Sequence, residues 1–136
     1  MTSATSLDAP ILRRLSVVDR FLPLWIFAAM AIVHSWPLAS NPGGLARLDN
    51  HDAETLTWTM AWVAHIVPRA PWQLFEAPVF YPEAHSLAFS EHMFVPSMLG
   101  APLLWAGAAP VLVYNLLIIL GLTLSGWAMY LVMERW

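Results

Sequence analysis

The acidic side chains of this sequence gather in one short polar stretch, and they are the residues best suited to acid–base chemistry. Asp49, Asp52 and Glu54 supply three of its nine carboxylates. A carboxylate can act as the general base that takes the proton from an alcohol or amine acceptor as a new bond forms. The same residue types cap the start of a helix and complement its dipole. Their spacing alone leaves both the catalytic and the structural interpretation open.

Histidines near these carboxylates raise the alternative of a metal site. His51 adjoins Asp52, and His92 follows Glu91 further along the chain. Oxygen and imidazole ligands of these types bind divalent cations. The histidines lack the i, i+4 helical pair of a zinc motif, so Asp52, His51 and His92 are weak candidates for metal ligands. We expect no cofactor other than a divalent metal.

Four further residues are candidates for binding a substrate. The Arg69 guanidinium presents a fork of donors that matches phosphate oxygens, but an arginine behind a helix end also caps the helix dipole. Tyr81 lies in an aromatic segment that could stack on sugar rings, although anchoring at a membrane interface is the favoured interpretation. Glu91 and His92 could complete a site over the acidic stretch, or they could form an ordinary polar boundary before a membrane helix.

The composition excludes several classes of protein. Apolar residues make up 59% of the 136 residues and charged residues 11%, whereas soluble domains carry roughly 25% charged residues. Eight tryptophans and eleven prolines suit a membrane interface better than a buried core. The net charge of -3 argues against a nucleic-acid partner, which requires a basic surface. The sequence therefore predicts an all-α membrane protein.

Three uncharged runs predict membrane-spanning helices over residues 21–39, 93–109 and 111–133. About 20 helical residues cross a hydrocarbon core of about 30 Å. The second run is short and interrupted by prolines, whereas the third is the most convincing. Residues 1–20 form a tail whose three arginines place the N-terminus in the cytoplasm. A cleaved signal peptide is the rival interpretation of this start, but its apolar core is usually shorter than the first run.

Residues 40–92 are then a long loop outside the membrane. It contains an amphipathic helix over residues 52–67, with Trp58, Trp62 and His65 near one face. This helix is too short to cross a bilayer comfortably and carries carboxylates at its head, so we expect it to lie in the interface. Behind it, residues 78–82 should be extended because prolines flank them.

Two features of the third run bear on helix packing. Gly121 and Ser125 are a small-xxx-small pair suited to a close helix contact. Asn115 is a costly polar group in lipid, so we expect it to face another helix. The chain stops directly after this run, and we expect it to be the N-terminal part of a larger polytopic fold.

A family resemblance is carried by two segments that lie between the first apolar run and a helical hairpin. They are residues 74–82 (LFEAPVFYP) and 87–92 (LAFSEH). From about residue 21 to 136 the chain resembles the N-terminal part of bacterial integral-membrane glycosyltransferases of the C-type fold. The resemblance implies transfer of a sugar from a polyprenyl-phosphate carrier to an acceptor at the outer face of the bacterial inner membrane.

The resemblance also implies which residues act and which partners are needed. The family places an acidic motif in the first outer loop, where Asp52 matches best and Asp49 and Glu54 are the alternatives. The implied partners are membrane lipid, the lipid-linked sugar donor and the remainder of a longer chain, without which we expect no activity. The alternative function is a non-catalytic polytopic membrane module, such as an assembly or transporter subunit.

Overall fold

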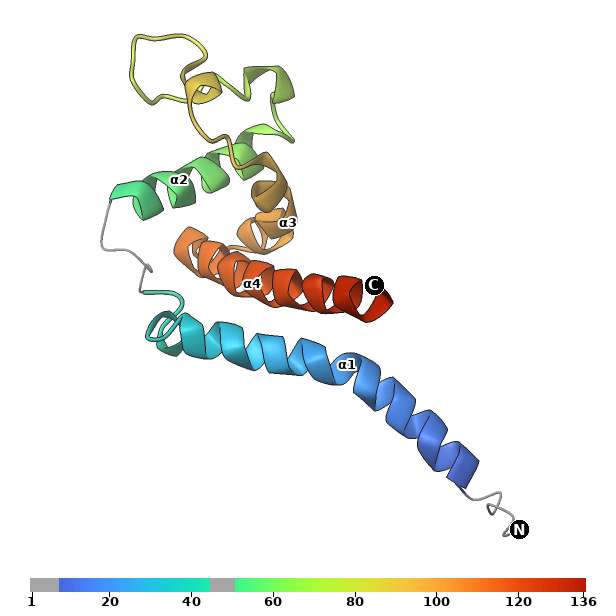
Figure 1. Ribbon diagram of the computed structural model, residues 1–136. Coiled ribbons are helices and arrows are strands. Elements are labelled where there is room, and N and C mark those ends of the chain that lie inside the picture. Colours follow the sequence, from blue (N-terminus) through green and yellow to red (C-terminus); the bar gives the residue numbers. More distant parts are fainter. Residues whose placement is uncertain (1–7, 45–50) are drawn as a thin grey trace, which may run out of the picture. The chain divides into compact units, whose positions relative to one another are not determined.

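The computed structural model describes residues 8–44 and 51–136, and every regular element among them is helical (Figure 1). The α-helices are α1 (Asp8–His34), α2 (His51–Ile66), α3 (Phe94–Trp105) and α4 (Pro110–Arg135). Short 3₁₀ turns occupy Leu38–Ser40, Pro71–Gln73 and Ser86–Phe89. The predicted all-α class is confirmed. The chain divides into one compact unit of Ser35–Ile118 and a second that joins α1 to Ile119–Trp136.

Helix α4 is the element best suited to a membrane. It has 26 residues, and its most apolar window has a mean hydropathy of 2.1. At about 1.5 Å per residue it is about 39 Å long, more than a hydrocarbon core of about 30 Å requires. The predicted helix over 111–133 is confirmed. Within the part of the chain that the structure describes, this is the one helix long and apolar enough to cross.

Helix α3 is shorter than the predicted second span over 93–109. It has 12 residues and ends at Trp105, so it is about 18 Å long. Gly107 ends it with a φ of 91°, and the Gly107 and Ala108 N–H groups donate to the Leu104 and Leu103 carbonyls at 3.0 Å each. This is a Schellman motif, which needs a left-handed residue that glycine adopts without strain. The predicted count of three spans is therefore not confirmed.

Helix α1 differs from the predicted first span over 21–39 at both ends. It begins at Asp8, so the described part of the predicted tail is helical and continuous with the apolar run. It ends at His34, three residues before Pro37. Pro23 lies inside the helix, where it removes a backbone donor and favours a bend (Figure 1).

In the unit that contains α1 and the end of α4, the close helix contact is at Gly126. A Cβ atom built on Gly126 would lie 2.5 Å from Cδ1 of Phe27, whereas one built on Gly121 would meet nothing within 4 Å. The close contact expected at Gly121 is thus not observed among the described residues. Gly126 makes such a contact because its missing side chain leaves room for the Phe27 ring.

In the unit of Ser35–Ile118, α2 packs against α3. A Cβ atom built on Gly100 of α3 would lie 2.6 Å from Cγ1 of Val113 and 3.8 Å from the Met60 sulfur, so three helices approach here. Asn115 at the start of α4 is fully buried and donates to the Pro42 carbonyl at 2.7 Å. The Nδ2 group of Asn115 thus has its partner in the backbone of a connecting segment, whereas the sequence predicts only that Asn115 faces another helix.

Candidate functional site

The C-terminal end of α2 is built around Pro68. Proline has no N–H group, so the Ala64 carbonyl lacks the donor that residue 68 would supply in a continuing helix. The Arg69 N–H donates instead to the Ile66 carbonyl at 3.0 Å, which deprives the His65 carbonyl of its usual partner. The adjacent Ala64 and His65 carbonyls thus need hydrogen-bond donors other than the backbone N–H groups of the helix.

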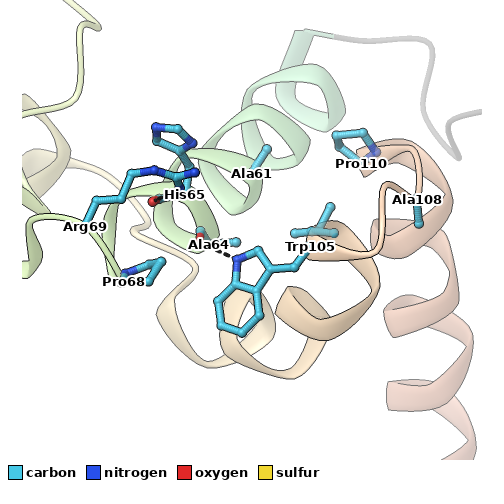
Figure 2. A pocket seen from close by; sticks show the side chains of 9 residues that line it. Ala61, Ala64, His65, Pro68, Arg69, Trp105, Ala108 and Pro110 are labelled. Carbon is cyan, nitrogen blue, oxygen red and sulfur yellow. Dashed lines mark hydrogen bonds between the residues drawn. The ribbon is translucent and has the colours of Figure 1, made fainter.

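Two side chains satisfy those carbonyls. The Trp105 indole Nε1–H, at the end of α3, donates to the Ala64 carbonyl at 2.9 Å. The Arg69 Nη1 donates to the His65 carbonyl at 2.8 Å. Both bonds hold a large side chain in a defined place at the end of α2 (Figure 2).

Between these side chains lies an open hollow of about 720 Å³. In Figure 2 Trp105 lies in the middle of the view, with Arg69 and His65 to one side of it and Pro110 to the other. The small side chains of Ala61, Ala64 and Ala108 leave the space unfilled. The volume falls in the range of about 300–1,000 Å³ that is typical of small-molecule pockets. Among the described residues, the lining contains the Arg69 guanidinium and the His65 imidazole but no acidic side chain.

The acidic residues lie at the opposite end of α2. Asp52 and Glu54 are exposed in its first turn, and α2 begins at His51 as the sequence predicts. Asp49 lies outside the described residues. From Asp52 to His65 the helix rises about 20 Å at about 1.5 Å per residue. Arg69 therefore does not share a site with Asp52 and Glu54, which lie at the other end of α2.

The two tryptophans of α2 lie on the face between those ends. Trp58 and Trp62 stack with their ring centroids 6.0 Å apart and their planes at 13°, as i, i+4 spacing predicts. The Trp62 indole N–H donates to the Leu74 carbonyl at 3.2 Å. On the opposite face Met60 and Val63 are fully buried. The helix predicted over 52–67 is thus observed as His51–Ile66.

His92 lies beyond the C-terminal end of α2, beside the segment that follows it. Its ring packs edge-on against Phe75 with centroids 6.2 Å apart. Its Nδ1 accepts a hydrogen bond from the Phe94 N–H at 3.2 Å, so the ring proton lies on Nε2. Glu91 is exposed next to it. The contact with Phe75 places His92, and Glu91 beside it, near the segment that follows α2. Asp52 and Glu54 lie in the first turn of α2.

The segment of residues 76–85 is a closed loop, and residues 78–82 within it are not extended as predicted. The Glu76 carboxylate spans its ends: Oε1 lies 2.7 Å from Nδ1 of His85, and Oε2 accepts from the His85 N–H at 3.2 Å. Phe80 has a φ of 61°, which ends any extended run. Tyr81 at the tip is 90% exposed, so it contributes to no enclosed site among the described residues.

The metal candidates are not brought together. The described residues contain no group of three His, Cys, Asp or Glu side chains placed to hold an ion. The His51 side chain lies outside what the structure describes, and Asp52 and His92 lie near different ends of α2. The requirement for a divalent metal stays a prediction.

Sequence reasoning found Arg69 but missed Trp105 and the role of His65 in the hollow. Pro68 was the available signal, because a proline at the end of a helix leaves carbonyl groups that other donors must satisfy. The sequence does not show that the donor comes from a residue 41 positions away. No known family model, curated protein or solved structure matches the chain.

Proposed function

We propose that this chain is the N-terminal portion of a bacterial membrane glycosyltransferase of the C-type fold. It moves a sugar from a polyprenyl-phosphate carrier to an acceptor at the outer face of the inner membrane. In this proposal the chain crosses the membrane several times, its N-terminus is cytoplasmic, and residues 40–92 are outside. The remaining spans belong to a longer polytopic chain.

The observation that carries the proposal is the exposed pair Asp52 and Glu54 in the first turn of α2. Both side chains are exposed, so an acceptor molecule can reach them. An accessible carboxylate is the group that a general base of this kind requires. The strongly apolar α4 supports a place in the membrane, where a lipid-linked donor is found.

The chemistry assigns one proton transfer to the acidic end of α2. The Asp52 carboxylate takes the proton from the acceptor hydroxyl or amine while the acceptor atom attacks the sugar C1. The bond between C1 and the carrier phosphate breaks, and the phosphate leaves with the bonding electrons. A single displacement of this kind inverts the configuration at C1. Tyr81, Glu91 and His92 remain candidates for contacts with the donor or acceptor.

The proposal is tested by reconstituting the complete protein in liposomes with a radiolabelled polyprenyl-phosphate sugar and an extract of membrane acceptors. Label that moves from the polyprenyl carrier into a second product, with release of polyprenyl phosphate, is the expected result. A complete protein that binds the donor but releases no polyprenyl phosphate with any acceptor would instead support the non-catalytic membrane module.

A further inference from the structure

We propose that the hollow at the C-terminal end of α2 binds a phosphate ester carried on a hydrocarbon chain, that is, the headgroup of a membrane lipid. The phosphate lies against Arg69 and His65, and the adjoining hydrocarbon lies against Leu104, Trp105 and Pro110. This inference requires a membrane but does not depend on sugar transfer. It assigns a second site, about 20 Å along α2 from the acidic residues.

The charge of the lining selects an anion. Arg69 is the one Lys or Arg among the described residues that line the hollow, and none of those residues is acidic. The bond from Nη1 to the His65 carbonyl uses part of the guanidinium fork. Its other N–H groups have no partner among the described residues, and they match the spacing of phosphate oxygens. That same bond offsets the partial negative charge of the helix end, which would otherwise repel an anion.

The side chains around the cation select an amphiphile over free phosphate. Trp105 is 59% exposed although its N–H is engaged inside the protein. Its ring therefore adds an exposed apolar surface to the hollow that the guanidinium also lines. Leu104 and Pro110 also line the hollow, and Ala61, Ala64 and Ala108 contribute only small side chains to it, which leaves space for a chain. A hydrated phosphate ion gains no free energy from contact with an apolar surface. The first carbons of a lipid chain do gain it, because the contact removes them from water.

The position of the hollow along α4 fits the same ligand. Pro110 is the first residue of α4 and also lines the hollow. When α4 crosses a membrane, its first residue lies at the boundary of the hydrocarbon core, where lipid phosphates lie. Tryptophan is also enriched at this level. The hollow would therefore open where phosphate and hydrocarbon meet.

Native mass spectrometry of the full chain in detergent tests the proposal by titrating phosphatidylglycerol. We expect Arg69→Gln to weaken binding at least about tenfold, which corresponds to 1.4 kcal/mol. The matched control is Arg135→Gln, which makes the same change at the end of α4 and should leave the affinity unchanged. Equal affinities for the two variants would overturn the proposal.

Further measurements separate the apolar contribution to lipid binding from the ionic one and verify that each variant is folded. Ala61→Leu fills the hollow while keeping both basic side chains and a good helix former, so it should also weaken binding. Circular dichroism before titration verifies that each variant keeps its helix content. Diacylglycerol with the same chains should not bind, and inorganic phosphate should bind far more weakly than the lipid. Inorganic phosphate that binds as tightly as phosphatidylglycerol would refute the lipid assignment.

Competition between phosphatidylglycerol and a polyprenyl monophosphate identifies the source of the phosphate. Preferential displacement by the polyprenyl compound supports a carrier lipid, and the reverse supports a bilayer phospholipid. Either preference supports the proposed site, provided that the Arg69→Gln variant loses that preference. Because binding is measured without any transfer reaction, a negative result here leaves the proposed enzymatic function to its own test.

Discussion

Trp105→Phe tests whether the proline at the end of α2 makes the Trp105 bond necessary. The substitution keeps a ring in the same place but removes the N–H that donates to the Ala64 carbonyl at 2.9 Å. Ala64 is 2% exposed, so water is poorly placed to replace the donor. Leaving a buried acceptor without a partner costs about 1–3 kcal/mol. We therefore expect the free energy of unfolding to fall by about 2 kcal/mol.

A double-mutant cycle isolates this bond from the other effects of losing an indole. Pro68→Ala restores a backbone N–H four residues after Ala64, where it can donate to the same carbonyl. In that background Trp105→Phe should cost at least about 1 kcal/mol less than in the natural sequence. Unfolding in detergent micelles is followed by far-ultraviolet circular dichroism. Trp72→Phe, at a position that is 77% exposed, is the matched control.

Two results would refute this account of the helix end. One is a Trp105→Phe variant no less stable than Trp72→Phe, which would mean that the indole bond contributes nothing. The other is an equal cost of Trp105→Phe with and without Pro68, which would mean that the Ala64 carbonyl does not depend on the indole.

Two other stability predictions follow from the packing within each unit. Gly126→Ala should be less stable than Gly121→Ala by at least about 1 kcal/mol, because only the first substitution places a Cβ atom 2.5 Å from the Phe27 ring. Thermal unfolding of the two variants measures this difference, and equal melting temperatures would contradict the contact. Asn115→Leu should lower the free energy of unfolding by about 1–3 kcal/mol, because it removes the donor to the Pro42 carbonyl. Denaturant titration measures this loss, and an unchanged unfolding midpoint would show that the bond does not stabilise the protein.

Local signals predicted α2 and α4 well. The acidic residues at the head of α2 and Pro68 behind it define a helix of nearly the observed length, His51–Ile66. The uncharged run from Val111 predicts α4 because no residue within it interrupts a helix. In both cases the information lies within the element itself, so the sequence is sufficient.

Features that depend on neighbours were harder to predict. The end of α3 depends on the Schellman motif at Gly107, which hydropathy alone does not reveal. Gly121 and Gly126 are equally small, and only the position of Phe27 shows which one is at the contact. The hollow likewise depends on the meeting of α2 with Trp105, whereas the sequence places Arg69 after a helix end without showing what lies opposite.

The measurement that tests the proposed function most directly is sugar transfer by Asp52→Asn in the complete protein. The substitution keeps the size and much of the capping ability of the side chain while removing the base. We expect transfer to fall at least about a hundredfold with an unchanged melting temperature, while Glu83→Gln, at an exposed carboxylate far from the acidic stretch in sequence, retains activity. Asp49→Asn and Glu54→Gln are measured beside it. Near-normal transfer by all three variants of the acidic stretch would show that its carboxylates only stabilise the start of α2, and would contradict the proposed mechanism.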